Sequence, residues 1–282
     1  MKHSVLALAL IGAVAARPTT KAVKREVPQE HSHENIIISV NNSLMKNNPD
    51  DIGDAIFALL GADAAAEGAG NIEDTDCLQL ATADQAFTNA KEEGDVDGMV
   101  SALIYRALER NTGSVGLASA LCTSIEAVNP EIAALQQHQD PASDGAAELN
   151  KGIAEELARQ IDSVGGDPAL ANEASTFAPG EIGDETGAGN TCNELDDEAG
   201  CINSQNLRVD DLSAAEIEAA VAGGAAANDA AVVDDAAAGN ATDVAPEAKG
   251  KGKAKANKGK NAAAADASAD ALQQIQAIAC AA

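Results

Sequence analysis

The 282-residue sequence contains almost no aromatic side chains: it has no tryptophan, one tyrosine and three phenylalanines. Proteins that bind sugars or single-stranded nucleic acids usually stack the ligand on aromatic rings. A carbohydrate-binding module does not fit this composition. Histidine is scarce as well, because His138 is the only one between residues 34 and 222. A Ser–His or Cys–His nucleophile pair would have almost no base to use there.

Familiar catalytic and cofactor motifs are also missing. The chain has no G-x-S-x-G, no H-E-x-x-H and no glycine-rich phosphate loop between a strand and a helix. It has no C-x-x-C, so zinc or thioredoxin-type chemistry has no support. Carboxylates are so numerous that no pair stands out for acid–base work. We therefore predict a protein that is not an enzyme and that has no cofactor and no metal site.

The N-terminus has the features of a secretory leader. Lys2 and His3 form a short basic start, and residues 5–15 (VLALALIGAVA) are an apolar run of signal-peptide length. Small residues at 13 and 15 give a signal-peptidase pattern, which predicts a signal peptide over residues 1–16. The apolar run is too short to span a bilayer as a helix. We expect a secreted protein without a membrane span.

A dibasic pair, Lys24-Arg25, lies in segment 17–33, which we predict to be a short pro-segment or flexible leader. Kexin-type proteases of the secretory pathway cut such pairs in flexible chain. The alternative is a pair of solvated charges. We favour cleavage, because the pair follows so soon after the signal peptide.

Positive charge is nearly absent from the body of the chain. Residues 26–222 hold 7 basic and 38 acidic side chains, a net charge near −31. Such a surface favours solubility and repels nucleic-acid phosphates and anionic lipids. We therefore expect no nucleic-acid partner.

A run of lysines near the C-terminus contrasts with this acidic body. Segment 249–260 (KGKGKAKANKGK) holds no acid and six candidate polyanion-binding residues: Lys249, Lys251, Lys253, Lys255, Lys258 and Lys260. A nuclear or nucleic-acid role conflicts with the signal peptide and with the charge of the body. Three interpretations stay open: binding to extracellular polyanions such as cell-wall polymers, contact with the acidic body, or a solvated spacer.

Five cysteines complete the unusual composition. In an oxidising compartment the four in the body should form disulfides, and four cysteines allow three pairings. Cys192 and Cys201 are nine residues apart in a loop-like segment, which favours a local bridge. Cys77 would then pair with Cys122. Cys280 is left over, either free or as a link between chains.

Hydrophobic periodicity predicts an all-α domain over residues 34–178, long enough to bury a core. The clearest helix is 96–113, with an apolar stripe formed by Met99, Val100, Leu103, Ile104, Ala107 and Leu108. Asn-Pro-acid starts predict helices at 47–61 and 129–139. No run alternates in the manner of a strand. Further helices are predicted over 35–46, 71–94, 117–128, 145–166 and 167–177.

The composition changes after residue 178. Residues 179–222 are rich in glycine, asparagine and acids, and we predict a disulfide-closed loop followed by a helix at 212–224. Ser213 and Glu216 have the spacing of a capping box at the start of that helix. Residues 223–282 lack side chains to build a core and should be disordered. The predicted fold is a disulfide-bridged helical bundle with a loop-rich appendage and a disordered, low-complexity tail.

Two patterns could suggest a metal, and both are weak. His31, His33 and Glu34 lack a further ligand at a defined spacing, so a polar leader is favoured. The acidic loop around Asp196 could offer oxygen ligands to Ca²⁺, but the alternating aspartates and central glycine of a calcium loop are missing. We favour a solvated acidic loop there, and we expect His138 to lie at the surface.

Two N-glycosylation sequons begin at Asn41 and Asn240. Either is usable in a secreted chain. Asn240 lies in the predicted tail and should be the more accessible. Asn41 lies in a predicted helix, where it would be buried or skipped.

Several stretches of the body resemble a group of mostly uncharacterised small secreted fungal proteins that are often labelled as cell-wall or extracellular proteins. The stretches are HENIIISVNNSLMKNNPDDIGDAIFALLGADAAAEGAG, ADQAFTNAKEEGDVDGMVSALIYRALERNTGSVGLASALC, NPEIAALQQHQDPAS and GNTCNELDDEAGCINSQNLRVDDLSAAEIEAAV. The resemblance covers residues 34–222 and excludes the tail. It implies a secreted, disulfide-bridged helical body and carries over no catalytic residue.

These features predict a secreted, non-enzymatic fungal protein of the cell wall or extracellular space, with a structural or interaction role. Two alternatives belong to other classes. A helical bundle could enclose an apolar pocket and carry a small ligand. The protein could also be a host-directed effector that binds a partner protein, which the sequence alone does not separate from the first role.

Overall fold

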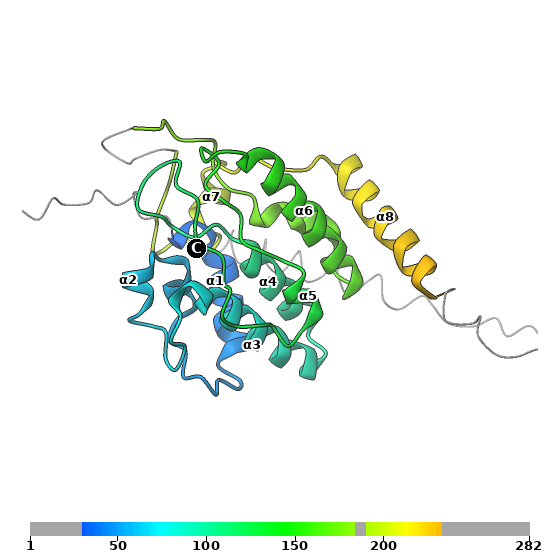
Figure 1. Ribbon diagram of the computed structural model, residues 1–282, viewed down its shortest axis with the longest axis horizontal. Helices are drawn as coiled ribbons and strands as arrows, with labels where there is room; N and C mark the ends of the chain where they lie inside the picture. The colour runs from blue at the N-terminus through cyan, green and yellow to red at the C-terminus, as the bar shows by residue number, and fades with distance from the viewer. Residues whose placement is uncertain (1–29, 184–189, 233–282) are drawn as a thin grey trace, which may run out of the picture.

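The computed structural model describes residues 30–183 and 190–232, and this part of the chain is helical (Figure 1). Its described residues contain no strand, only one isolated antiparallel bridge between Phe177 and Arg208. The α-helices are α1 (Glu34–Leu44), α2 (Ala62–Ala65), α3 (Leu78–Glu93), α4 (Val96–Ala107), α5 (Pro130–Ala133), α6 (Ala146–Ser163), α7 (Cys201–Ser204) and α8 (Ala214–Val232). The 3-10 helices are η1 (Glu30–His33), η2 (Ala55–Leu59), η3 (Thr75–Cys77) and η4 (Pro168–Ala174).

Helix α4 lies at the centre of the bundle and packs against α1, α3 and α6. Its start is set by a local cap, and its end lies six residues before the end of the predicted helix 96–113. The Asp95 carboxylate accepts the Gly98 N–H at the start, and the helix stops at Ala107 because Leu108 is extended. The whole predicted stripe from Met99 to Leu108 is buried, which confirms that prediction.

Small side chains let the helices approach closely. The core contains many buried alanines, and large buried side chains such as Phe87 and Tyr105 lie among them. The Tyr105 hydroxyl donates a hydrogen bond to the Ala55 carbonyl at 2.5 Å. Burial raises the pKa of this phenol far above its ordinary value. The single tyrosine is therefore a core residue that connects α4 to η2.

The predicted helix over 47–61 is wrong in its first half. Asn48 forms two side-chain bonds with the backbone of Ile52, and residues 50–53 pair with the backbone of residues 68–71. Gly70 has a φ of +56°, and a Cβ there would lie 2.2 Å from the Asp50 carbonyl. Only the 3-10 turn η2 remains of this helix, because long-range pairing takes the amides that a helix would need.

Two other predicted helices are wrong or shortened. Segment 117–128 is irregular, and the helix predicted over 129–139 is reduced to α5. Side chains from distant parts of the chain bind their backbone: Gln139 accepts the Ser119 N–H, and Asp84 accepts the Val128 N–H. The helix predicted over 167–177 is the 3-10 helix η4.

The boundary at the N-terminal side of the body also differs from the prediction. The last four residues of the predicted leader form η1, in which Glu30, Ser32 and His33 are buried. The helices predicted over 35–46, 71–94 and 145–166 are present as α1, η3 with α3, and α6.

Helix α8 begins with the predicted capping box. The Ser213 hydroxyl and backbone N–H both donate to Glu216 Oε2. The helix packs against α6 (Figure 1) and continues to Val232, which is nine residues beyond the predicted start of the tail. No helix in the described ranges is long and apolar enough to cross a membrane.

Candidate functional site

Both predicted disulfides are present. Cys77 bonds to Cys122 with a Cα–Cα distance of 4.5 Å, and Cys192 bonds to Cys201 with a distance of 6.1 Å. The first connects the start of α3 to the irregular segment 111–129. The second closes a short loop directly before α7.

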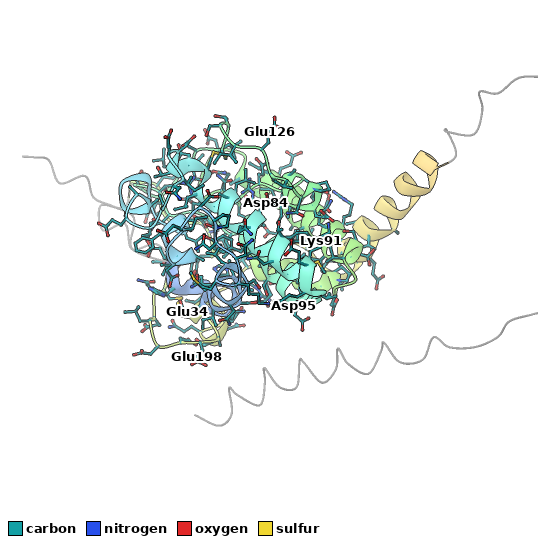
Figure 2. The ribbon with its side chains drawn as sticks, turned by 90° about the horizontal axis from the view of Figure 1, so that it is seen from below. Glu34, Asp84, Lys91, Asp95, Glu126 and Glu198 are labelled. Atoms are coloured by element: carbon teal, nitrogen blue, oxygen red, sulfur yellow. A yellow bond between two sulfur atoms is a disulfide. The ribbon has the colours of Figure 1, made fainter. Side chains whose placement is uncertain are left out.

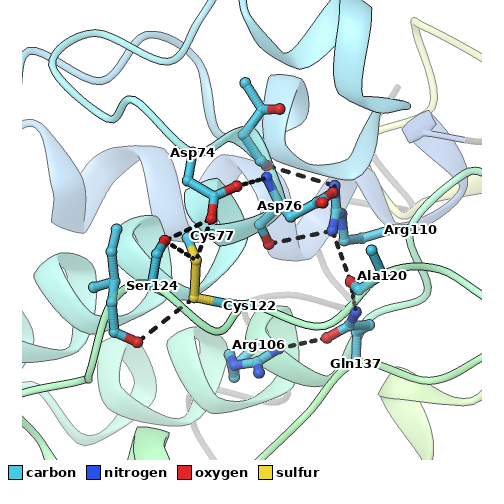
Figure 3. The surroundings of a disulfide bond; sticks show 11 residues. Asp74, Asp76, Cys77, Arg106, Arg110, Ala120, Cys122, Ser124 and Gln137 are labelled. Atoms are coloured by element: carbon cyan, nitrogen blue, oxygen red, sulfur yellow. Dashed lines mark hydrogen bonds and ion pairs between the residues drawn. A yellow bond between two sulfur atoms is a disulfide. The ribbon is translucent and has the colours of Figure 1, made fainter.

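Side chains rather than helices hold the irregular segment around Cys122 in place (Figure 3). The buried Arg110 donates to the carbonyls of Asp76 and Ala120 and forms a 3.3 Å ion pair with Asp76. Gln137 Nε2 also donates to the Ala120 carbonyl, at 2.7 Å. The segment therefore depends on the disulfide and on a few long side chains for its order.

Arg106 lies beside this network and differs from Arg110. Its guanidinium is buried and donates to Gln137 Oε1 at 3.1 Å, and no carboxylate among the described residues forms an ion pair with it. Burial and the neighbouring Arg110 lower the pKa of Arg106 to about 10.

A buried polar cluster joins the helical bundle to its C-terminal part. The Ser175 hydroxyl donates to Asp211 Oδ2 at 2.5 Å, and the Asp211 N–H donates back to Ser175 Oγ at 3.1 Å. Next to it, Asn172 exchanges two hydrogen bonds with the backbone of Leu212. These pairs connect residues 36 to 40 positions apart and fix where the chain returns to the bundle.

His138 completes this cluster from the opposite side, and the prediction that it lies at the surface is wrong. Its side chain is fully buried, and its Nδ1 lies 2.6 Å from the Ala107 carbonyl, so Nδ1 carries a hydrogen. Its Nε2 faces Asp211 Oδ2 at 3.3 Å. Burial raises the pKa of Asp211, but His138 and the Ser175 hydroxyl outweigh burial, and the pKa is lower than usual.

His33, which we expected in a polar leader, is a second buried histidine at this junction. Its Nε2 faces the Ser175 carbonyl at 3.3 Å, and its Nδ1 lies 2.9 Å from Ser32 Oγ. A carbonyl only accepts, so Nε2 is the protonated nitrogen and Nδ1 accepts the serine hydrogen. Both contacts are made by a neutral imidazole. Burial lowers the pKa of His33 to about 4.

The arrangement contains serine, histidine and aspartate, but not in the order that nucleophilic catalysis uses. The Ser175 hydrogen is held by a carboxylate instead of by an imidazole, and Ser175 is fully buried. Ser32 does contact an imidazole. The pocket around Ser32 and His33 has room for about one water molecule. We interpret this cluster as a structural junction.

The structure places the predicted glycosylation site Asn41 in a structural role. Its Nδ2 donates to Asp54 Oδ1 and its Oδ1 accepts the Ala55 N–H, both at 2.8 Å. The third residue of the sequon, Ser43, is buried. A glycan on Asn41 would grow from the amide that fixes η2 to α1.

The acidic loop around Asp196 binds its own backbone and neighbours. Asp197 accepts the Ala199 N–H and the Ser204 hydroxyl, while Asn193 accepts the His31 N–H. Within residues 30–183 and 190–232, no group of three or more His, Cys, Asp or Glu side chains is placed to hold a metal ion. The His31 ring pairs with Glu34 at 2.6 Å.

Acidic side chains spread over the whole body. Figure 2 shows Glu126 and Glu198 at opposite sides of the molecule, with Asp84 and Asp95 between them and Lys91 nearby. The remaining predicted sites lie outside the described residues: Lys24, Arg25, Asn240, Cys280 and the six lysines of 249–260.

No family model, no curated protein and no solved structure matches this chain. Sequence reasoning missed the buried junction, because nothing in QQHQD or EHSHE distinguishes a buried histidine from an exposed one.

Proposed function

We propose that this chain is a secreted, non-enzymatic fungal protein of the cell wall or extracellular space. Its helical body would be exported through the predicted signal peptide, and its lysine run would hold it on anionic wall polymers. The observation that carries the proposal is the pairing of all four body cysteines, since such bonds persist in oxidising compartments.

Processing at Lys24-Arg25 is compatible with this folded body. The described structure begins at Glu30, whose Oε1 accepts a hydrogen bond from Asn111 Nδ2 at 2.8 Å. A cut after Arg25 would leave four residues before Glu30, the first residue that the structure describes. The body would keep η1 and its buried junction.

The charge distribution supports different roles for the acidic body and the lysine run in the tail. The body carries a net charge near −31, so it would be repelled from an anionic wall. The lysine run 249–260 would supply the attraction. Contacts of this kind between solvated charges weaken strongly with salt.

A comparison of three full-length forms tests the proposal: the wild type, a form with the six lysines changed to glutamine, and a form with all six changed to arginine. Each is expressed in a secreting fungal host, and immunoblots quantify the protein in the medium, in the salt wash of the wall and in the cells. We expect the wild-type and arginine forms in the salt wash and the glutamine form in the medium. Retention of all forms inside the cell would contradict secretion, and equal partition of all forms would contradict the anchor.

One observation favours a protein partner as the second candidate. Leu117, Leu121 and Val128 are exposed on the segment that Cys122 and its neighbours hold in place, and Val128 is 84% exposed. The ligand-carrier alternative gains nothing from the pocket at His33, which has room for about one water molecule. Wall retention that resists salt and is lost when the three apolar residues become serine would support the protein partner.

A further inference from the structure

The two cysteines of the Cys77–Cys122 disulfide differ in exposure. Cys77, directly before α3, has no exposed surface, whereas Cys122 is partly exposed on the irregular segment 111–129. Its neighbours Leu121 and Thr123 are exposed, so this part of the segment lies at the surface. Thiols exchange with a disulfide by attack of a thiolate on one of its two sulfurs, and access helps to decide which one. We therefore expect an external thiol to reach the bond at Cys122.

Two oxygen atoms lie against the buried sulfur (Figure 3). Asp74 Oδ2 lies 3.6 Å from Cys77 Sγ, and Ser124 Oγ lies 3.2 Å from it. A disulfide sulfur has no hydrogen to donate to either of them. The Ser124 hydroxyl donates its own hydrogen to Asp74 Oδ2 at 2.5 Å, so it turns a lone pair toward the sulfur. The buried sulfur therefore faces a carboxylate charge and a second acceptor.

The positive charge of this network is directed elsewhere. Arg110 forms an ion pair with Asp76 and donates to the Ala120 carbonyl, and among the described residues it makes no contact with either sulfur. Cys77 is the N-cap of α3, and the start of a helix carries roughly half an elementary positive charge. The Cys77 side chain accepts no hydrogen bond from the amides there. The full charge of Asp74, 3.6 Å from the sulfur, therefore outweighs the helix terminus.

We propose that Cys122 is a site of reversible S-thiolation by low-molecular-weight thiols, and that the Asp74 carboxylate slows the exchange. The thiolate sulfur forms a bond with Cys122 Sγ while the bond to Cys77 Sγ breaks, and the electron pair of that bond leaves with Cys77. Water supplies a proton to the Cys77 thiolate, and the resulting thiol donates it to Asp74 Oδ2. No net oxidation or reduction takes place, because one disulfide replaces another.

The carboxylate acts on the rate because the transition state of the exchange is anionic. The attacking sulfur, Cys122 Sγ and Cys77 Sγ share one negative charge while one bond forms and the other breaks. Asp74 repels the part of this charge that lies on Cys77, and it does so in both directions of the reaction. Opening and reclosure of the bridge are therefore both slow. A full charge 3.6 Å from this sulfur should change the rate on the order of 10-fold.

Exchange with 2-mercaptoethanol, a small monothiol with no other ionisable group, tests the proposal on the oxidised, full-length protein. Early samples are quenched with acid, free thiols are alkylated with N-ethylmaleimide, and tryptic peptides are mapped by mass spectrometry. Cleavage after lysine and arginine places Cys77, Cys122 and Cys280 on different peptides. We expect the mercaptoethanol adduct on Cys122 and the maleimide on Cys77. An adduct mainly on Cys77, or equal amounts on both cysteines, would overturn the proposal.

Two variants separate the Asp74 charge from the net charge of the body. Asp74→Asn keeps a side chain of the same shape without the charge, and its Cys122 adduct should form on the order of 10-fold faster than that of the wild type. Glu126→Gln removes the same charge from an exposed residue of the same segment and should react as the wild type. An unchanged rate in Asp74→Asn, or an equal acceleration in Glu126→Gln, would contradict the role of Asp74.

The Cys192–Cys201 bridge is an internal reference in the same molecules. Asp74 also caps η3 by accepting the Asp76 N–H, so a weaker cap in Asp74→Asn would be a second way to speed the reaction, through unfolding. Unfolding exposes both bridges, and Cys192 and Cys201 would then react faster as well. We expect exchange at this second bridge to keep its wild-type rate in Asp74→Asn. Acceleration of both bridges by the same factor would overturn the charge argument.

Discussion

Removal of the Cys77–Cys122 disulfide is the sharpest test of how this body is stabilised. The bridge closes 45 residues of chain, while Cys192–Cys201 closes nine. Loop-closure entropy gives about 4 kcal/mol for the first and about 2.6 kcal/mol for the second at 25 °C. Domains of this size have free energies of unfolding of roughly 5–15 kcal/mol. Loss of the first bridge should therefore remove a large part of the stability.

The structure gives a physical reason why loss of Cys77–Cys122 should cost more stability than loss of Cys192–Cys201. Segment 111–129 has no helix of its own and is held by the disulfide and by long side chains such as Arg110 and Gln137. The Cys192–Cys201 bridge stabilises a small apolar cluster outside the main core. Its loss should loosen residues 190–211 more than it changes the free energy of global unfolding.

The assay is guanidinium unfolding of two double variants, Cys77→Ser with Cys122→Ser and Cys192→Ser with Cys201→Ser, followed by far-ultraviolet circular dichroism. We expect the first variant to lose about 4 kcal/mol and the second to lose less. A loss below about 1 kcal/mol in the first variant, or a larger loss in the second, would refute the reasoning.

Three further predictions follow from single side chains. Asn41→Ala should cost about 1–2 kcal/mol in thermal unfolding, because it removes the two hydrogen bonds that join α1 to Asp54 and Ala55. Peptide mass spectrometry of protein from a secreting fungal host should find a glycan at Asn240 and none at Asn41. Arg106→Met should leave the melting temperature unchanged or raise it, since it removes a buried charge that has no carboxylate partner among the described residues. Arg110→Met should lower the melting temperature, because it removes the ion pair with Asp76. A large fall of the melting temperature in Arg106→Met would contradict this reasoning. The pKa of His33 is 6.5 in the unfolded chain and about 4 in the folded protein, so its contribution to stability is full above pH 6.5 and falls by about 3 kcal/mol as the pH drops to 4. Urea unfolding at pH 7 and pH 4.5 measures this fall in the free energy of unfolding. The fall should be smaller in His33→Gln.

Helices with a strong apolar stripe could be predicted from the sequence. Irregular segments whose backbone is held by tertiary contacts could not. The stripe of α4 and the capping box of α8 are local patterns, so both were confirmed. The segment 117–128 has a comparable apolar spacing, yet its amides bind Gln139 and Asp84. Such partners lie 20 to 44 residues away, which a local pattern does not show.

The sequence by itself determined the helical class, the acidic body and the two disulfides, because periodicity, charge and cysteine spacing are properties of the chain. Only the tertiary structure decided which polar residues are buried and which partners they bind. His33 and His138 are buried, Asn41 accepts the Ala55 N–H, and Asp211 is the partner of Ser175. Burial and pairing depend on which distant segments meet, and that depends on how the helices pack.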